Sequence, residues 1–171
     1  MTEADAVRCV VETPKGSQNK LKYDEEQQAF RLSHVLPVGM SFPFDFGFLP
    51  GTRGGDGDPL DVLILMDAPC PMGCLVDARL IGVLEVEQRE ADGAVVRNDR
   101  LIAVATTSTT HRETRELRDV SPALLTQIEA FFDQYNRLDG KRFRVLHRRG
   151  SGAAMALARR ASIDHGQGTT R

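Results

Sequence analysis

Residues 54–65 have the sequence GGDGDPLDVLIL, an acidic loop that runs directly into a hydrophobic strand. Asp56, Asp58 and Asp61 lie so close together that their carboxylates repel one another. A carboxylate at the edge of a core becomes protonated unless a positive charge keeps it ionised. Oxygen ligands with no cysteine or histidine beside them favour Mg²⁺, Mn²⁺ or Ca²⁺ over zinc. The run therefore predicts a cation-binding site where a buried strand begins.

A simple turn is the alternative interpretation of this run. The sequence Asp-Gly-Asp-Pro is a strong turn signal, and for Asp56 alone a solvated turn residue is the favoured reading. Asp61 differs because it stands among five aliphatic residues, where a carboxylate needs a partner. An EF-hand is excluded, since its fifth and sixth positions would be Leu60 and Asp61. A P-loop is unsupported because its Gly-x-x-x-x-Gly-Lys-Ser/Thr motif does not occur.

The composition is that of an ordinary globular protein. The chain has 171 residues, 41% of them hydrophobic and 27% charged, with a formal net charge of −2. This length suits one substantial core, so we expect a single domain over residues 1–171. The charge gives no electrostatic reason to expect nucleic-acid binding.

Neither a secretory signal nor a membrane span is expected. The N-terminal residues have no charged start followed by an apolar run, and no stretch approaches the ~20 apolar residues that span a bilayer. We therefore expect a cytoplasmic protein with no membrane partner. The three cysteines, Cys9, Cys70 and Cys74, complete no zinc motif, which favours free thiols in a reducing compartment.

Strand patterns dominate the first two thirds of the chain. Hydrophobic segments separated by Gly, Pro and Asp clusters predict strands at residues 7–12, 20–23, 30–32, 60–66, 75–87 and 101–105. Strands that come first and helices that come late favour a mainly β (α+β) fold. We expect an antiparallel barrel with helices packed on one side, rather than a parallel α/β sheet.

The last third predicts two helices around one more strand. Ser121 and Pro122 provide an N-cap and a first helical residue, and hydrophobic residues then recur at helical spacing as far as Tyr135. Residues 142–146 are typical of a closing strand. The alanine-rich stretch 151–163 predicts a second, weaker helix, and the tail at 164–171 is expected to fray.

The segment 56–62, DGDPLDV, resembles the signature of the soluble, family I inorganic pyrophosphatases (inorganic diphosphatases), in a divergent bacterial-type form. The similarity extends in order from about residue 7 to about residue 145. The supporting segments are ETP at 12–14, KYD at 22–24, FPFDFGF at 42–48, IGV at 81–83, NDRLIAV at 98–104 and FFDQY at 131–135.

This resemblance implies both a fold and an activity. The fold is an OB-like five-stranded closed β-barrel with two C-terminal helices packed on it. The activity is Mg²⁺-dependent hydrolysis of inorganic pyrophosphate to two phosphates, with Mn²⁺ as a second candidate metal. Bacterial members are usually hexamers, so a homo-oligomer is implied by the resemblance alone.

The resemblance also implies roles by position. Asp56 and Asp61 would be metal ligands, Asp58 would accept the proton of the attacking water, and Glu12 would serve the outer metals. The residues placed around the phosphates are Lys22, His34, Arg100, Tyr135 and Lys141. Without the resemblance, Glu12 and Lys22 would be read as surface ion-pair residues and Tyr135 as a core residue.

Several positions depart from the family pattern. Asn98 stands where the family has a metal-binding aspartate, and Asp99 follows it, so either could ligate. Neighbouring residues on a strand point to opposite faces, and Asp99 would need a bulge to turn inward. Further departures lie at His34, Phe46, Gln88, Arg100 and Asn136.

These changes remove charge and hydrogen-bond donors around the substrate, which leaves two other functions open. One is a related phosphohydrolase that acts on another diphosphate, and the other is a non-catalytic, metal-binding paralogue.

Overall fold

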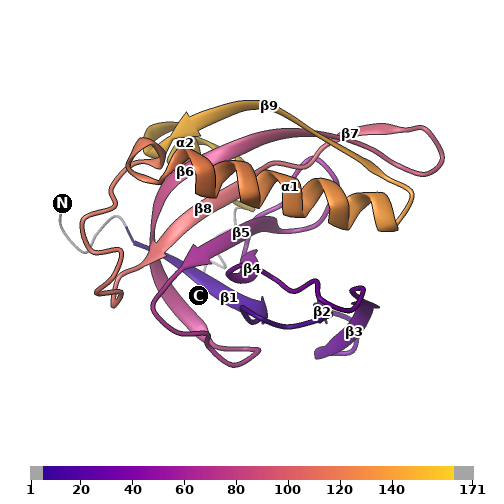
Figure 1. Cartoon of the computed structure of the whole chain (residues 1–171), viewed down its shortest axis with the longest axis horizontal. Coiled ribbons are helices and arrows are strands. Elements are labelled where there is room, and N and C mark those ends of the chain that lie inside the picture. The colour runs from indigo at the N-terminus through magenta and orange to yellow at the C-terminus, as the bar shows by residue number, and fades with distance from the viewer. Residues whose placement is uncertain (1–5, 164–171) are drawn as a thin grey trace, which may run out of the picture.

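The computed structural model describes residues 6–163 and shows a mostly β protein crossed by two helices (Figure 1). The expected fraying at 164–171 falls outside the described residues. The strands are β1 (Val7–Thr13), β2 (Asn19–Asp24), β3 (Ala29–Val35), β4 (Asp45–Leu49), β5 (Leu60–Leu65), β6 (Leu75–Arg89), β7 (Val95–Arg97), β8 (Arg100–Ala105) and β9 (Arg142–Gly150). The helices are η2 (Leu117–Asp119), α1 (Pro122–Leu138) and α2 (Ser151–Ala161).

Five strands close into a ring in the order β1-β4-β5-β8-β6, and the pairing of β1 with β6 completes it. The predicted five-stranded OB-like barrel is confirmed. One detail differs from the expected antiparallel barrel, because β5 and β8 run parallel, with Asp61 beside Arg100. Strands β7 and β9 extend the sheet from the long strand β6, and β2 and β3 form a separate hairpin.

Alternate residues of β5 enter two different hydrophobic clusters. Val62 and Ile64 join a cluster to which all five ring strands contribute, which is the barrel interior. Leu63 and Leu65 point the other way, into a cluster that includes residues of α1. Side chains two apart on a strand share a face, so one strand supports both clusters. The helices were expected on one side, but α2 packs its buried alanines on the interior cluster and α1 covers the outer one.

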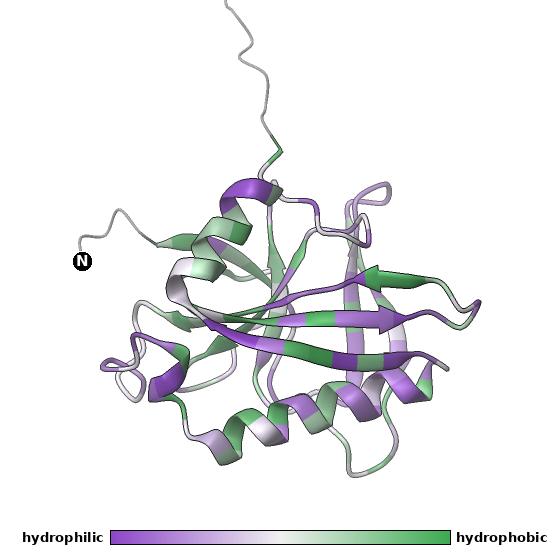
Figure 2. Cartoon of the chain, turned by 90° about the horizontal axis from the view of Figure 1, so that it is seen from above, coloured by the Kyte–Doolittle hydropathy of each residue, from purple (hydrophilic) through white to green (hydrophobic). Residues whose placement is uncertain are grey.

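Helix α1 forms where the sequence predicts it. Pro122 begins the helix, and Leu125, Ile128 and Phe132 are buried at helical spacing on one face. Hydrophobic and hydrophilic residues accordingly alternate along this helix in Figure 2. Neither α1 nor any other helix within residues 6–163 is long and apolar enough to cross a membrane.

Two strands, β4 and β7, were not predicted. All five residues of β4 are buried, so this strand lacks the alternation of polar and hydrophobic residues that marks a half-buried strand. Strand β7 has only three residues and pairs with the end of β6. The predicted second helix ends two residues early, at Ala161.

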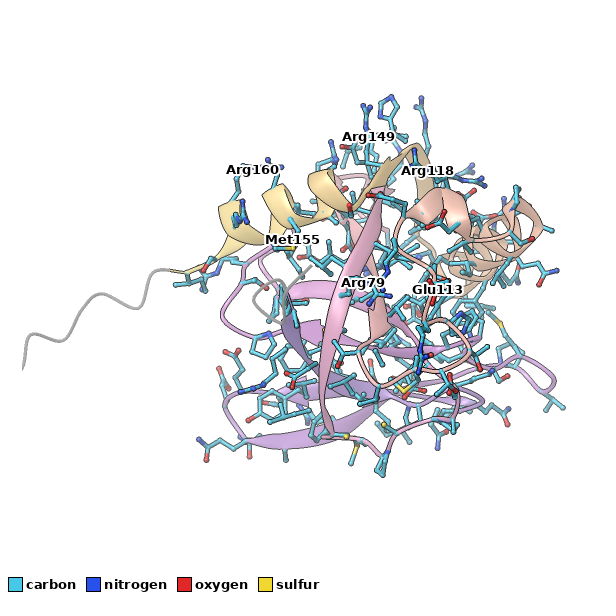
Figure 3. The ribbon with its side chains drawn as sticks, turned by 90° about the vertical axis from the view of Figure 1, so that its left-hand side faces the viewer. Arg79, Glu113, Arg118, Arg149, Met155 and Arg160 are labelled. Atoms are coloured by element: carbon cyan, nitrogen blue, oxygen red, sulfur yellow. The ribbon has the colours of Figure 1, made fainter. Side chains whose placement is uncertain are left out.

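Arg79 fixes the loop that leads from β8 to α1. Its guanidinium donates to the backbone carbonyl of Thr114 at 2.8 Å, and Figure 3 shows Arg79 on β6 directed toward the loop that carries Glu113. Asp67 holds the start of the same loop, because its carboxylate accepts hydrogen bonds from Ser108 and Thr109. These bonds lower the pKa of Asp67. The segment before α1 is therefore anchored to the barrel from two directions.

Candidate functional site

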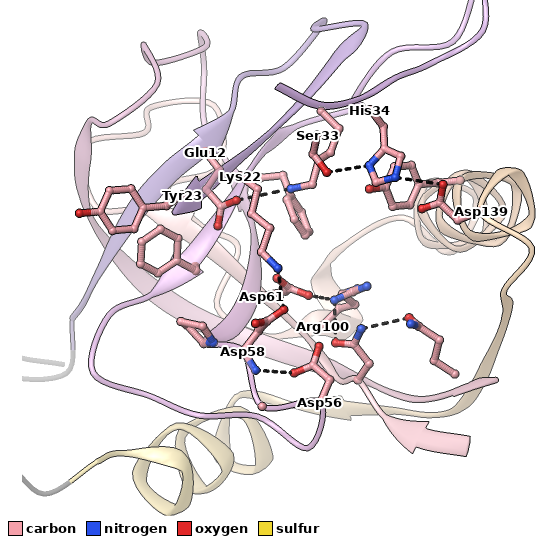
Figure 4. Close-up of a pocket in the computed structure, with 18 of the residues that line it drawn as sticks. Glu12, Lys22, Tyr23, Ser33, His34, Asp56, Asp58, Asp61, Arg100 and Asp139 are labelled. Carbon is pink, nitrogen blue, oxygen red and sulfur yellow. Dashed lines mark hydrogen bonds and ion pairs between the residues drawn. The ribbon is translucent and has the colours of Figure 1, made fainter. Parts of the chain in front are cut away.

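A cavity of about 1060 Å³ lies on the outer face of the barrel, between the β2–β3 hairpin, the acidic loop (residues 54–59) and the end of α1. Asp56, Asp58 and Asp61 all line it, as does Glu12 of β1 (Figure 4). The acidic loop and β5 deliver the three aspartates to this wall because β5 begins immediately after the loop. The structure thus brings together the carboxylates that the sequence singles out.

A tight turn presents Asp56 and Asp58. Gly57 adopts a φ of 89°, which a residue with a side chain rarely tolerates, and the carbonyl of Asp58 accepts a bond from the Gly54 N–H at 2.7 Å. The Asp56 carboxylate accepts the Asp58 N–H at 3.1 Å. Burial and then the charge of Asp58 raise the pKa of Asp56, although that N–H bond opposes the shift. The positive charge near Asp56 is therefore too weak to offset its burial and the charge of Asp58.

Asp58 is paired with Lys22 of β2. The two charged groups are 2.8 Å apart, and both side chains are about half exposed, at 54% and 53%. The hydrogen bond to Asp58 is the main cause that raises the pKa of Lys22. An exposed ion pair contributes little to stability, so either group is free to exchange this partner for a ligand.

Asp61 is paired with Arg100 at the base of the cavity. The two residues are neighbours in the parallel pairing of β5 and β8, and the guanidinium contacts the Asp61 carboxylate. The Arg100 guanidinium lies 5.8 Å from the ring centroid of Phe46 and 5.4 Å from that of Phe132. Only 5% of the Arg100 side chain is exposed, and burial lowers its pKa to about 10. Its Nε atom has no hydrogen-bond partner within residues 6–163.

Glu12 has a buried partner, Lys20, which the sequence reading missed. The Lys20 ammonium is 3.6 Å from the Glu12 carboxylate and 4.4 Å from the ring centroid of Phe46. Burial lowers the pKa of Lys20 to about 8 and raises that of Glu12. The available signal was the i, i+2 spacing of Lys20 and Lys22, which places two lysines on one face of a strand.

Asn98, and not Asp99, faces the cavity. The Asn98 side-chain carbonyl accepts from Arg100 at 2.8 Å, and its amide donates to Gln88 at 3.0 Å. The Asp99 carboxylate points away and accepts hydrogen bonds from the backbone N–H of Val86 at 2.8 Å and from Arg97 at 2.9 Å. The two residues form the short connection between β7 and β8, where their side chains point in different directions and Asp99 is not turned toward the cavity.

Three further residues predicted to surround the phosphates, Tyr135, His34 and Lys141, line the same cavity. Burial raises the pKa of the Tyr135 hydroxyl to about 12, so this group stays protonated at neutral pH. His34 lies 3.1 Å from Asp139, and Lys141 lies 3.0 Å from Glu90. The two basic side chains therefore reach the cavity with a carboxylate already beside them.

Two of the departures from the family pattern are packing residues. Phe46 is buried and lies beneath the charged groups of Lys20 and Arg100. Asn136 is also buried, and its amide donates to the carbonyl of Phe132 within the same helix, at 2.8 Å. Neither side chain presents a charged group to a ligand.

The donor set of the cavity fits a hard divalent cation. Its wall carries the carboxylate oxygens of Glu12, Asp56, Asp58 and Asp61, which are ligands that Mg²⁺ and Mn²⁺ prefer. The His34 imidazole on the same wall pairs with Asp139 instead. Across residues 6–163, however, no three acidic, histidine or cysteine side chains are grouped closely enough to hold a metal as they stand. Three of the four carboxylates face a lysine or arginine instead.

Fold and site together define a class of protein: an OB-like barrel whose outer face carries a cavity lined by clustered carboxylates and cationic side chains. Comparison with known proteins narrows this class. The family model described as inorganic pyrophosphatase matches residues 9–164. On the strength of this match and the relatives below, the chain belongs to the inorganic pyrophosphatase family.

Its relatives cover nearly the whole chain. The chain is 34% identical over 161 residues to an inorganic pyrophosphatase of Methanosarcina acetivorans, covering 94% of this chain and 93% of the relative. It is 36% identical over 156 residues to one from Geobacillus stearothermophilus, covering 91% of each. Among solved structures, the inorganic pyrophosphatase from Thermus thermophilus matches with a TM-score of 0.84 and 34% identity, covering 93% of this chain and 90% of that one.

Proposed function

We propose that this protein hydrolyses inorganic pyrophosphate to two phosphates in a reaction that depends on Mg²⁺, with Mn²⁺ as a substitute. The observation that carries the proposal is the convergence of Asp56, Asp58 and Asp61 with Lys22 and Arg100 on one cavity. Membership of the inorganic pyrophosphatase family supports the same activity. A substrate with several negative charges requires both cations and donors, and this cavity offers sites for both.

Asp56, Asp58, Asp61 and Glu12 would hold the divalent ions. Bound there, the ions would offset the charge of pyrophosphate and increase the acidity of a water molecule. The ion pairs of Lys22 with Asp58 and of Arg100 with Asp61 occupy the carboxylates beforehand. Lys22 and Arg100 would therefore give up these carboxylates to bound ions, and their charges would then be available to the substrate.

Asp58 is the residue best placed to accept a proton. Its carboxylate is half exposed in the cavity, whereas that of Asp61 is only 22% exposed and is held by Arg100. Lys22, released from Asp58, donates to a phosphate oxygen from the hairpin side. Tyr135 donates its hydroxyl from α1, since its raised pKa of about 12 keeps it protonated.

The direct test is phosphate release by the purified protein, with Mg²⁺, with Mn²⁺ and with a chelator. We expect release from pyrophosphate with either metal and none with the chelator. A panel containing pyrophosphate, triphosphate and a nucleoside diphosphate distinguishes substrates, and pyrophosphate should give the highest kcat/KM. Faster release from another diphosphate would contradict the proposed substrate.

A second candidate is a non-catalytic or slowly acting relative that keeps the metal site. The neutral amides of Gln88 and Asn98 favour it, because they stand on the cavity wall without adding negative charge for metals. This account predicts metal binding by calorimetry without phosphate release. It further predicts that an Asn98→Asp, His34→Arg variant gains activity that the natural sequence lacks.

The assembly and location of the protein remain part of the proposal. We propose a cytoplasmic homo-oligomer, a hexamer by family resemblance. The exposed hydrophobic side chains of Leu32, Val35 and Val38 on and beside β3 support self-association, because apolar residues gathered on one hairpin favour a covered surface. Sedimentation velocity measures the mass directly, and a monomer at micromolar concentration would contradict this part.

A further inference from the structure

The segment between β5 and β6 holds two cysteines, Cys70 and Cys74, at opposite ends of one tight turn. The Cys74 N–H donates to the carbonyl of Pro71 at 3.1 Å, and Gly73 adopts a φ of 87° inside that turn. This geometry is a β-turn with glycine at its third position, which brings the chain ends together. Cys70 directly precedes the turn and Cys74 closes it, so the two thiols lie on the same short loop.

The two thiols also interact with each other. Hydrogen bonding to Cys74 contributes, after burial, to raising the pKa of Cys70. Both side chains are only partly buried and pack against the same hydrophobic cluster. The Cys74 thiol donates in turn to the Leu75 carbonyl at 3.6 Å. The two thiols are therefore held on one short, ordered loop and are partly exposed to small reagents in solution.

The backbone around both cysteines is fixed. The Cys70 N–H donates to the Asp45 carboxylate at 2.8 Å, and the carbonyl of Cys74 accepts from the Val11 N–H at 3.0 Å. The Gly73 N–H donates back to the carbonyl of Val11 at 2.8 Å. Two sulfurs held on an anchored turn have a high effective concentration for each other, which favours reaction within the pair over reaction between molecules.

We propose that Cys70 and Cys74 form a reversible intramolecular disulfide when the protein meets a peroxide. The Cys74 thiolate attacks one peroxide oxygen, so that an S–O bond forms, the O–O bond breaks and the departing hydroxide takes up a proton to become water. The Cys70 sulfur then attacks the sulfenic sulfur, forming the S–S bond while the S–O bond breaks. The Cys70 proton leaves with the second water.

In this reaction the two thiols lose two electrons and two protons, and the peroxide is reduced to two waters. A dithiol reductant reverses the change by thiol–disulfide exchange. The consequence for the protein is local. The disulfide would crosslink the turn that bonds to Val11, one residue before Glu12 of the cavity. No step requires the proposed hydrolytic activity.

Cys9 provides an internal control. Its side chain is fully buried in the barrel interior, and burial raises its pKa to about 12. A thiol that is neither accessible nor ionised should not react. The native protein is thus expected to have two reactive thiols and one silent thiol among its three cysteines.

The test treats the native full-length protein with a small excess of hydrogen peroxide and then alkylates it before and after denaturation. We expect the intact mass to fall by two hydrogen atoms, and alkylation of Cys70 and Cys74 to drop at least about tenfold. Peptide mapping should find the 70–74 crosslink, and dithiothreitol should restore both thiols. Cys9 should alkylate only after denaturation.

Three variants separate the pair from general oxidation. Cys70→Ser should abolish the crosslink and leave a sulfenic acid on Cys74, and Cys74→Ser should abolish it and leave Cys70 a thiol. Cys9→Ala should keep the crosslink. The loss of two hydrogen atoms in either serine variant would overturn the proposal. So would independent oxidation of Cys70 and Cys74 to sulfinic acids in the native protein, or a crosslink that joins two chains.

Discussion

The two walls of the cavity differ in charge: one carries carboxylates and the other carries neutral amides. The carboxylate wall, Glu12, Asp56, Asp58 and Asp61, faces Lys20, Lys22 and Arg100. The amide wall, Gln88 and Asn98, consists of neutral groups bonded to each other and to Arg100. Divalent cations bound at the first wall would therefore have to displace lysine or arginine side chains, whereas the neutral second wall needs no counter-ion. We expect the rate of the chemical step to depend on the carboxylate wall and the metal requirement to depend on the amide wall.

The largest effect is expected from Asp58→Asn on the carboxylate wall. The amide cannot accept a proton from water, and a positioned base contributes roughly 10²- to 10⁴-fold to a rate. We expect kcat for pyrophosphate to fall by that factor. Because the Asp58 side chain is half exposed, the melting temperature should stay nearly unchanged.

Glu113→Gln is the matched control for this change, since Glu113 is also exposed but lies outside the cavity. It should keep full activity. Steady-state phosphate release and thermal unfolding, measured on the same samples, separate lost chemistry from lost structure. Unchanged turnover in Asp58→Asn would remove this carboxylate from the mechanism.

The next largest effect is expected at Arg100, which connects the two walls. Arg100→Met leaves the Asp61 carboxylate without its partner and removes the donor to Asn98. Loss of one member of a buried ion pair costs several kcal/mol, and the partial exposure of Asp61 reduces this to about 2–4 kcal/mol. Urea unfolding with a chelator present measures this free energy without any contribution from metal.

Arg100→Lys serves as the comparison, because it keeps the charge beside Asp61 and loses only the forked geometry. We expect it to unfold within about 1 kcal/mol of the natural protein, the value of one ordinary hydrogen bond. If the two variants lost the same stability, then the charge of Arg100 would not be what stabilises Asp61.

A moderate effect is expected from adding charge to the amide wall. Asn98→Asp places a carboxylate on the cavity, which should lower the Mg²⁺ concentration for half-maximal activity by about tenfold, equivalent to about 1.4 kcal/mol. The neighbouring change Asp99→Asn is the control. Its side chain bonds to Arg97 and the Val86 N–H outside the cavity, so the metal requirement should not change. A shift of the Mg²⁺ requirement in Asp99→Asn alone would reverse the assignment of the two residues.

Hydrophobic patterns in the sequence predicted much of the fold but not all of it. Strands β5, β6 and β8 and helix α1 carry clear patterns, and their predicted positions agree with the structure. Strand β4 is buried on both faces and has no alternation to detect. The parallel pairing of β5 with β8 joins segments far apart in the chain, so no local pattern specifies it.

The candidate site was also predicted only in part. The three aspartates were visible because they are close in sequence. The resemblance named Lys22 and Arg100, but not their pairing with Asp58 and Asp61, because both cations reach the aspartates from other strands. Lys20, the partner of Glu12, was missed. The direction of Asn98 and Asp99 likewise depends on whether the backbone bulges, which two adjacent polar residues do not reveal.

The smallest effect is expected from Lys141, and it measures how far the two walls differ in holding substrate. Lys22 and Lys141 are both lysines on the cavity, each paired with one carboxylate at about the same distance, 2.8 and 3.0 Å. Lys22 would lose its partner if a metal bound Asp58, whereas Glu90 accepts from Gln88 at 2.5 Å and would stay beside Lys141. Lys22→Ala should therefore raise KM for pyrophosphate roughly tenfold, as the loss of one charged hydrogen bond does. Lys141→Ala should raise it no more than about twofold, because a lysine that stays in a partly exposed ion pair gives the substrate little. Equal increases in KM would mean that Lys141 leaves Glu90 for the substrate, and that both walls bind it.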